Sequence, residues 1–379
     1  MYKSLCLFSL LCLFSGCKST KNPITQVLKS DNIAIKKVAE QPDHYELQII
    51  YTSIKRDKKG KVILKDHKYN VDASNYFYPA STVKLPIAVL ALEKLNKMNG
   101  VDVNTTFTVD GSDEKHSFSD DLRKVFAVSS NEANNDFYEF MGRDYINKTL
   151  SDKGLKPVSI VHRLSTPKSG ASETKKIIFY KENGEEISIP SVKDSPIVPL
   201  KLNKISKGKG YNSDGKLVDS PMDFSTKNYL PLETLHGVLK RVVFPDNFSS
   251  KERFDLPAKN RELFLYDMQN LPKNAGYDPK TYYDGYCKFF MFGDTKDGIP
   301  SNIKIYNKVG DAYGTLVDCA YIVDEYNGIE FMISATLLVN EDQIFNDDHY
   351  NYEDIGLPFL AQLGRAFYDL NLKESKKAN

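Results

Sequence analysis

Apolar and polar residues alternate in strand-like segments near both ends of the chain. Two such segments, residues 45–54 and 62–69, lie near the N-terminus. Three more lie toward the C-terminus, at residues 302–308, 315–324 and 328–339, and the first of these is typical of an edge strand. Alternation with a period of two is typical of strands with one covered face, so the pattern predicts five strands.

Helical patterns lie between and after these strands. Residues 85–95 are mostly apolar and rich in strong helix formers, and Pro86 fits such a helix only in its first turn. Residues 357–372 also have a helical pattern. We therefore expect an α+β fold, an α/β sandwich with a helical lobe. Its antiparallel sheet of about five strands is built from both chain ends and flanked by helices, and the mainly helical lobe lies in the middle. A cleft between sheet and lobe would suit catalysis.

The middle of the chain also contains a hairpin pattern and an aromatic segment. Residues 176–180 and 186–189 are β-like and flank Asn183-Gly184, a dipeptide favoured in hairpin turns. Residues 282–286 contain three tyrosines. These rings either line a substrate cleft or, as is more frequent, pack against the body of the domain.

Composition excludes several classes of protein. The 379 residues are 41% hydrophobic and 27% charged, so the chain can bury a full core. A net charge of +1 argues against a nucleic-acid binder that neutralises phosphates. The six histidines form no H-x-x-x-H arrangement, and no glycine-rich phosphate loop occurs. We expect no metal, no other cofactor and no nucleic-acid partner.

Ser81 and Lys84 form an S-x-x-K motif at the start of the helix predicted over residues 85–95. Residues three apart share one helix face, so both side chains can reach the same cleft. A lysine whose charge is suppressed can remove the serine proton, and free N–H groups at the helix start can hold an oxyanion. The same spacing recurs in polar or irregular stretches that open no long apolar helix, at Ser112, Ser165, Ser172, Ser206, Ser213 and Ser301.

A second motif is Ser129-Ser130-Asn131, which precedes a segment with apolar residues at helical spacing. Its hydroxyl and amide groups can relay a proton and hold a substrate amide. Serine and asparagine are also the preferred residues at a helix N-cap, and that structural role alone would explain them.

The third motif, Lys308-Val309-Gly310, follows the alternating residues 303–308. Lys308 supplies a positive charge for an anionic group, and Gly310 would let a substrate backbone approach the strand closely.

The three motifs in this order resemble the class A β-lactamase and penicillin-binding serine hydrolase superfamily, whose signatures are S-x-x-K, S-D-N and K-T-G. Residues 76–85 look like that family's nucleophile segment, and residues 307–315 look like its K-T-G strand and turn. The resemblance covers about residues 45–165 and 220–370. It implies a β-lactamase/transpeptidase-like fold.

The resemblance also implies roles for single residues. Ser81 would be the acylated nucleophile, Lys84 its base or proton relay, and Ser129 the proton shuttle to the leaving nitrogen. The backbone N–H groups of Ser81 and Asp311 would form the oxyanion hole. Asn131 would hold the acyl-side amide, and Lys308 would order the charges around Ser129 and the substrate carboxylate. The substrate-binding set is Asn131, Lys308, Gly310 and Asp311.

Three departures from the family pattern bear on the reaction. Ser130 replaces the aspartate of S-D-N, which is mainly structural in the family. Val309 replaces the threonine of K-T-G and removes a hydroxyl that would bind a β-lactam carboxylate. The stretch around Arg163 resembles the start of the loop that carries the deacylating glutamate, but Lys168 lies near the expected position. Glu173 is the nearest acid downstream and a weak candidate for the base.

The motif spacing indicates added segments. Ser129 precedes Lys308 by 179 residues, which is more than the class A relatives need. Insertions are expected at about residues 168–220 and 248–300.

The N-terminus predicts export. Residues 1–4 form a short basic segment. Residues 5–14 form an apolar run that is too short to span a bilayer as a helix. Residues 13–17 resemble a bacterial lipobox, which implies cleavage before Cys17 and a lipid on it; an ordinary signal peptide is the alternative. We expect a signal peptide at 1–16, a tether at 17–26 and a serine β-lactamase-like catalytic domain at 27–379, lipid-anchored to a bacterial membrane, on the periplasmic face or cell surface.

The mature body keeps two cysteines, Cys287 and Cys319, since Cys6 and Cys12 leave with the signal peptide. The pair is compatible with a disulfide in an oxidising compartment, and a buried free thiol at Cys319 is equally compatible with its apolar surroundings.

Together these features predict a serine hydrolase that forms an acyl-enzyme through Ser81 and hydrolyses β-lactam amides. A penicillin-binding or D-alanyl-peptidase-like enzyme and a non-catalytic cell-wall-binding lipoprotein are the alternatives. Without a loop glutamate, the acyl-enzyme would be long-lived. The expected partners are a β-lactam or cell-wall peptide and a membrane, and we expect a monomer.

Overall fold

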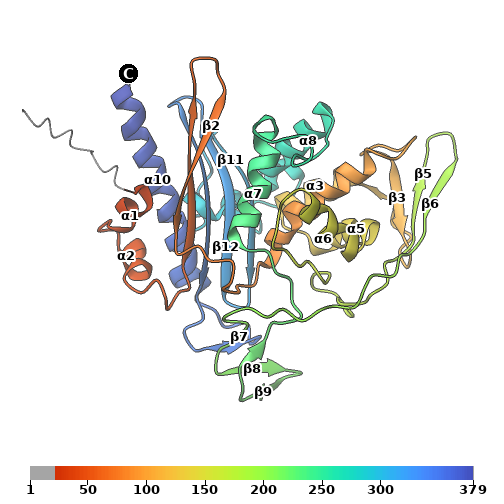
Figure 1. The fold of residues 1–379 in the computed structure, drawn as a ribbon, viewed down its shortest axis with the longest axis horizontal. Helices are drawn as coiled ribbons and strands as arrows, with labels where there is room; N and C mark the ends of the chain where they lie inside the picture. Colours follow the sequence, from red (N-terminus) through yellow and green to blue (C-terminus); the bar gives the residue numbers. More distant parts are fainter. Residues whose placement is uncertain (1–21, 379) are drawn as a thin grey trace, which may run out of the picture.

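The centre of the molecule is a five-stranded antiparallel sheet with the strand order β11-β12-β13-β1-β2. The computed structural model describes residues 22–378. The predicted sheet from both chain ends, and with it the α+β fold, is confirmed (Figure 1). As predicted, β11 is an edge strand. The five strands are β1 Gln48–Arg56, β2 Val62–Tyr69, β11 Ile303–Ala312, β12 Thr315–Asp324 and β13 Ile329–Leu338.

Pairing between strands that are far apart in the sequence joins the two halves of the sheet. Strand β1 pairs with β13 in the register Gln48↔Thr336, so the first strand of this sheet in the sequence lies beside its last. On the other side of the sheet, β11 pairs with β12 in the register Lys308↔Cys319. The long middle of the chain must therefore leave the sheet after β2 and return at β11.

Helices cover both faces of the sheet (Figure 1). Helix α10 packs on one face, where Phe359 and Phe367 share an apolar cluster with Ile305 and Val309 of β11. The helix predicted over residues 357–372 is confirmed and continues to Ala378. The helices on this side are α1 Pro23–Leu28, α2 Ile33–Ala39, α9 Phe289–Phe292 and α10 Leu357–Ala378, and α7 Leu232–Val243 packs on the opposite face.

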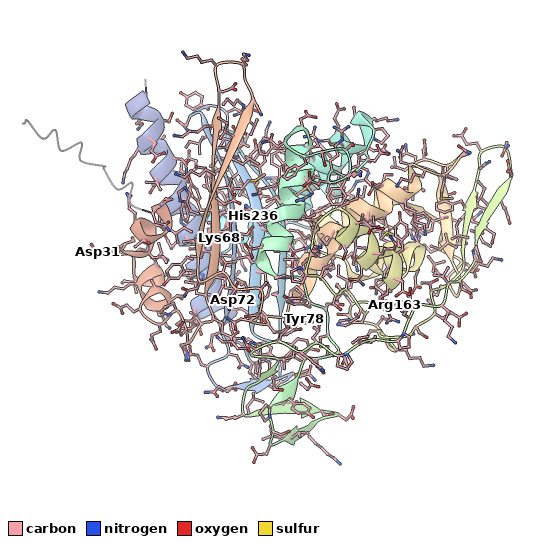
Figure 2. The ribbon with its side chains drawn as sticks, viewed as in Figure 1. Asp31, Lys68, Asp72, Tyr78, Arg163 and His236 are labelled. Atoms are coloured by element: carbon pink, nitrogen blue, oxygen red, sulfur yellow. The ribbon has the colours of Figure 1, made fainter. Side chains whose placement is uncertain are left out.

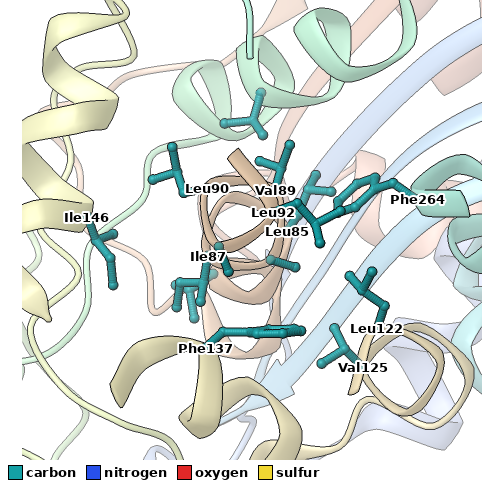
Figure 3. Packing of buried hydrophobic residues seen from close by; sticks show 14 of the residues in the cluster. Leu85, Ile87, Val89, Leu90, Leu92, Leu122, Val125, Phe137, Ile146 and Phe264 are labelled. Carbon is teal, nitrogen blue, oxygen red and sulfur yellow. The ribbon is translucent and has the colours of Figure 1, made fainter. Parts of the chain in front are cut away.

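The helical lobe is built around α3, Lys84–Leu95. Every residue from Lys84 to Glu93 is buried, so α3 has no solvent-exposed face over this length. Leu90 and Val89 of α3 point into a core that also contains Phe137 and Phe264 (Figure 3). The predicted helix is confirmed, and the helices around it are α4 Phe118–Ala127, α5 Asn131–Met141, α6 Arg143–Asp152 and α8 Ala258–Gln269.

The middle of the chain, predicted to be a mainly helical lobe, contains more strands than expected. The predicted hairpin is confirmed as β5 and β6, with Gly184 at φ +83° in its turn. A four-stranded sheet, in the order β4-β3-β5-β6, joins this hairpin to the lobe. Its strands are β3 Thr106–Val109, β4 His116–Ser117, β5 Ile177–Tyr180 and β6 Glu186–Ile189.

Two further small sheets lie below the main sheet in Figure 1. One pairs β7 with β10, and the other has the order β14-β8-β9. Their strands are β7 Ser206–Lys207, β8 Gly210–Ser213, β9 Lys216–Val218, β10 Met222–Asp223 and β14 Ile344–Phe345. The short helical turns are Ala80–Val83, Pro245–Asn247, Pro272–Ala275, Asp284–Cys287 and a π-helical turn at Tyr352–Gly356.

Some element boundaries differ from the prediction. Strand β1 begins at Gln48 rather than residue 45, because Glu46 has φ +46° and interrupts the extended chain. Helix α1 begins at Pro23, and its residue Ile24 is buried, so the predicted tether boundary at residue 26 lies inside a packed helix. The signal peptide at 1–16 and the lipid site Cys17 lie outside the described residues. No helix within residues 22–378 is long and apolar enough to cross a membrane.

A buried histidine joins α7 to the sheet. Thr52 Oγ1 donates its proton to Asp66 Oδ1 at 2.7 Å and lies 2.7 Å from His236 Nε2. Since the threonine has one proton, Nε2 must donate to it, and Nδ1 accepts from Ser334 Oγ at 2.7 Å. His236 is labelled in Figure 2 beside the sheet. Burial lowers its pKa to about 3, so the folded protein holds a neutral ring.

This arrangement predicts acid sensitivity. In the unfolded chain a histidine titrates near pH 6.5, so the contribution of His236 to the free energy of unfolding is complete above that pH and is lost as the pH falls toward 3. We expect a loss of roughly 2 kcal/mol between pH 6.5 and 4.5 from this group. Denaturant unfolding at several pH values measures it. His236→Gln should flatten the slope, whereas the exposed control His349→Gln should not; equal slopes would contradict the assignment.

Candidate active site

Ser81 lies in a single 3-10 turn, Ala80–Val83, directly before α3. Ala80 has φ +46°, a left-handed conformation that is costly for a residue other than glycine and that recurs at functional turns. Thr82 Oγ1 donates to the Pro79 carbonyl at 2.5 Å and braces the turn. Ser81 itself is partly exposed and lines a cavity of about 510 Å³. The turn therefore presents the predicted nucleophile to this cavity.

Lys84 is fully buried beneath that turn. Its Nζ donates to Asn131 Oδ1 at 2.7 Å, to Ser129 Oγ at 3.2 Å and to the Ser129 carbonyl. Burial, reinforced by the charge of Lys308, holds the pKa of Lys84 well below its usual range. Within the described chain, the Ser81 hydroxyl makes no hydrogen bond, and the hydrogen bonds of Lys84 go to the second motif. The spacing predicted the shared location, and tertiary contacts determine which groups the amine touches.

The second motif forms the turn between α4 and α5. Ser130 is the N-cap of α5, and its side chain accepts from the Ala133 N–H at 3.2 Å. Serine is among the residues preferred at this position, because its hydroxyl satisfies a free N–H group of the first turn. Ser129 has φ +57°, which directs its side chain toward the lysines. The capping role belongs to Ser130, so Ser129 and Asn131 are available for chemistry.

Lys308 reaches the same turn from the edge strand β11. Its Nζ donates to Ser129 Oγ at 2.8 Å and to the Val309 carbonyl at 2.9 Å. Burial lowers the pKa of Lys308, and the nearby Cys287 and Asp311 oppose that shift. Ser129 Oγ thus joins two buried lysine amines, one from the lobe and one from the sheet.

Gly310 packs against the nucleophile turn. A Cβ atom at this position would lie 2.7 Å from the Ser81 nitrogen and 2.9 Å from the Thr82 nitrogen, so no side chain fits without moving the strand. The sequence predicted that Gly310 lets a substrate backbone approach; in the structure the backbone of Ser81 and Thr82 lies against it. Val309 points the other way, into the apolar cluster under α10, and does not line the Ser81 cavity.

Asn131 and Asp311 line the cavity with Ser81. Asp311 is solvent-accessible there. Partial desolvation by the walls of the cavity raises the pKa of its carboxyl group, and the charges of Lys308 and Lys84 oppose this rise. Tyr78 forms part of the wall of the cavity. Its ring stacks on the ring of His162, with 6.3 Å between the ring centroids and 8° between the ring planes. All seven predicted catalytic and binding positions are thus in or directly beneath one site.

The loop after Arg163 is firmly held. The Arg163 guanidinium pairs with Glu139 in a buried bidentate contact, at 2.8 Å between Nη2 and Oε2, and donates to the carbonyls of Ala171 and Glu173 at 3.0 and 2.9 Å. Asn135 of α5 exchanges two hydrogen bonds with the Leu164 backbone at 2.8 and 2.9 Å. The R-L pattern indicated this loop, but its anchors on α5 have no sequence signal.

Glu173 does not reach the Ser81 cavity. It is exposed, its Oε1 accepts from Ser191 Oγ at 3.3 Å, and it lines a neighbouring cavity of about 660 Å³. The loop residues that line the Ser81 cavity include Ser165, Thr166 and Ser169, but no acid. In residues 22–378 the carboxylates of that cavity are Asp311 and Asp348.

A buried polar network supports the strand behind Lys308. Lys288 Nζ donates to Asn307 Oδ1 at 2.8 Å, and Asn307 Nδ2 donates to Asp318 Oδ1 at 2.9 Å. Burial lowers the pKa of Lys288 to about 8 and raises that of Asp318 to about 6. Sequence reasoning missed this network because its members come from three separate segments.

The structure also describes the two cysteines and the aromatic segment at residues 282–286. Cys287 and Cys319 are both buried free thiols, which answers the question that the sequence left open. Tyr286 packs edge-on against Tyr282 at 4.9 Å and against Tyr283 at 6.0 Å, and none of the three lines the Ser81 cavity. The three rings therefore pack on one another away from the Ser81 cavity, and Tyr286 is 38% exposed.

No sequence motif indicated a cation site, yet three potential ligands meet in the larger cavity beside the Ser81 cavity. They are His116, Asp121 and Asp136. The two cavities share lining residues, among them Asn131 and Ser165, so they adjoin each other along the start of α5. Figure 2 shows Tyr78 beside the sheet and Arg163 in the lobe, and both line the Ser81 cavity.

Comparison with known proteins gives one family match. Residues 34–189 match the model described as the beta-lactamase enzyme family. This segment contains Ser81, Lys84, Ser129 and Asn131 and ends before Lys308. No curated protein matches the chain by sequence.

Several solved structures are similar in fold. A β-lactamase from Desulfarculus baarsii has 12% identity and a TM-score of 0.49, with 88% of this chain and 97% of that chain covered. One from Xanthomonas campestris has 13% identity and a TM-score of 0.49, with 90% and 98% covered. A class A β-lactamase from Mycobacterium abscessus has 13% identity and a TM-score of 0.47, with 89% and 99% covered. Likeness at this level says nothing about activity.

The family match covers the first two motifs, and the fold brings the third motif onto the same serine turn. Residues 34–189 are therefore similar to the beta-lactamase enzyme family, and this similarity includes the first two motifs.

Proposed function

We propose that this protein is a serine hydrolase that is acylated by β-lactams at Ser81. One observation carries the proposal: Lys84, Ser129 and Lys308 form a single hydrogen-bonded chain directly beneath the Ser81 turn. Two buried lysines that share one hydroxyl cost desolvation energy, and packing alone gives no reason to keep them.

Acylation would use this chain to move one proton. Lys84 with a suppressed charge accepts the proton of Ser81 while Oγ attacks the lactam carbonyl. The backbone N–H groups of Ser81 and Asp311 would hold the oxyanion, as Gly310 permits β11 to lie against the turn. The C–N bond then breaks, and Ser129 passes the proton to the leaving nitrogen. The product is an ester on Ser81.

Deacylation is expected to be slow. Hydrolysis of the ester requires a base that activates water, and the residues of the loop after Arg163 that line the Ser81 cavity include no acid. Glu173, the weak sequence candidate, lines the neighbouring cavity instead. This supports a penicillin-binding or D-alanyl-peptidase-like reaction as the second candidate, because such enzymes hold a long-lived β-lactam adduct and share the acylation chemistry.

Export and lipid anchoring also belong to the proposal. The support is the sequence of residues 1–17, with a basic start, an apolar run and a lipobox-like end at Cys17. We propose a monomer tethered to a bacterial membrane. In a bacterial host, radiolabelled fatty acid should be incorporated into the wild type and not into Cys17→Ala, with Cys287→Ala as the control. Equal labelling of all three would contradict the anchor.

Ser81→Ala should abolish acylation and leave folding intact. The measurement is mass spectrometry of the protein mixed with a penicillin, which should show one covalent adduct on Ser81 that persists for minutes. Ser301→Ala, another S-x-x-K serine that is exposed, is the control and should label normally. A Ser81→Ala protein that still labels would refute the nucleophile. Rapid turnover that Glu173→Gln abolishes would refute the slow-deacylation argument.

Lys84→Met should lower the acylation rate by at least about 100-fold, because a positioned general base contributes roughly that factor or more. In the wild type the rate should rise with pH as Lys84 loses its proton, at a pH well below the usual range for lysine. Stopped-flow acylation with a fluorescent penicillin measures both. Lys97→Met, whose side chain is exposed on the turn after α3, should keep the wild-type profile. A profile unchanged by Lys84→Met would exclude this lysine as the base.

A further inference from the structure

Three ligand-type side chains converge at one end of the larger cavity, outside the acylation machinery. His116 Nε2 lies 3.1 Å from Asp136 Oδ2 and 3.4 Å from Asp121 Oδ2. All three ligand atoms lie within 4.8 Å of one another. His116 comes from β4, Asp121 from α4 and Asp136 from α5.

One member of this cluster has no hydrogen-bond partner although it is buried. Asp121 is 1% exposed, and its Oδ2 accepts no hydrogen bond within the described chain. His116 has one Nε2, and its hydrogen bond goes to Asp136. Lys124 lines the same cavity but forms no ion pair with either carboxylate in residues 22–378. A buried carboxylate without a donor is unfavourable, so a positive partner at its Oδ2 would stabilise the cluster.

A divalent cation would satisfy this cluster. Two carboxylates and a neutral imidazole balance a charge of +2, whereas an imidazolium alone leaves one negative charge unpaired. Zinc binds nitrogen and oxygen at about 2.0 to 2.2 Å, so neighbouring ligands in a tetrahedral site lie roughly 3.4 Å apart. The two distances from His116 Nε2, 3.1 and 3.4 Å, are close to that value. Asp136 is 15% exposed and can adjust, and solvent in the cavity can supply the fourth ligand.

We propose that His116, Asp121 and Asp136 form a binding site for a divalent transition-metal ion, with zinc the best fit to one imidazole and two carboxylates. Imidazole favours zinc over magnesium or calcium, and two carboxylates make manganese the next candidate. Binding requires a neutral His116 imidazole with its proton on Nδ1. In the described chain this nitrogen is buried and has no hydrogen-bond partner. The imidazole packs against the ring of Phe107, with 4.3 Å between the ring centroids.

The ion would hold α4 against α5. These helices flank the turn that carries Ser129, and Asn131 lies at the start of α5. The site therefore has a positioning role for that turn and does not itself touch the reacting atoms. It does not depend on the proposed acylation, since a Ser81→Ala protein should bind the ion equally well.

The test is zinc titration of chelator-treated full-length protein by calorimetry, with cobalt absorption as a second readout of nitrogen and oxygen ligands. We expect one equivalent of zinc that Asp121→Asn weakens at least about 10-fold, and a rise in Tm on the order of 5 °C at saturation. Asp136→Asn, at a partly exposed position, gives the same answer if Asp121→Asn fails to fold. Asp152→Asn, an exposed carboxylate on α6, is the matched control.

The comparison of variants separates this site from the cysteine thiols of the chain, which are the same in every protein. Loss of one zinc equivalent in both Asp121→Asn and Asp136→Asn, with Asp152→Asn unchanged, supports the site. Equal zinc affinity and equal thermal shift in all four proteins would overturn it and leave His116 as a hydrogen-bonded residue only. Binding of manganese in place of zinc, lost in the same two variants, would support the site and correct the metal.

Discussion

The burial of lysine amines in one region constrains much of the structure. Lys84, Lys288 and Lys308 are 0, 1 and 2% exposed. An ammonium group removed from water must find oxygen acceptors or lose its proton, and each of these three amines has oxygen acceptors. The Ser129 turn supplies acceptors to Lys84 and Lys308, and Asn307 supplies one to Lys288. The same burial lowers the pKa values of these amines, which is the property a general base requires.

These contacts also join the two halves of the fold. Lys84 comes from the central helix of the lobe, and Lys308 comes from the edge strand of the sheet. Both donate to one hydroxyl of the lobe, so the contact from Lys308 ties the edge strand of the sheet to the lobe. Gly310 adds a second constraint, because the absence of a side chain lets β11 lie against the backbone of Ser81.

Helix α5 serves several purposes along one length. Its first residue, Asn131, contacts Lys84, while Asn135, one turn later on the same face, holds the backbone of Leu164 and so the loop beside the cavity. Asp136 lies on the adjoining face and meets His116. The position of α5 therefore couples the proton-transfer groups, the loop and the proposed metal site, and Ser130 fixes the point at which the helix begins.

The sequence alone determined the strands of the main sheet, the helix after Ser81 and the three motifs, because each depends on local periodicity or short spacing. It also marked β11 as an edge strand. Only the tertiary structure decided that Lys84 hydrogen-bonds to Ser129 and Asn131, that Val309 packs away from the cavity and that Glu173 lies beyond it. The Lys288 network, the Arg163–Glu139 pair and the His116 cluster were likewise invisible, since their members are far apart in the chain. Sequence periodicity specifies which face of an element is covered, but the partner of a buried polar group is set by strand register and helix packing.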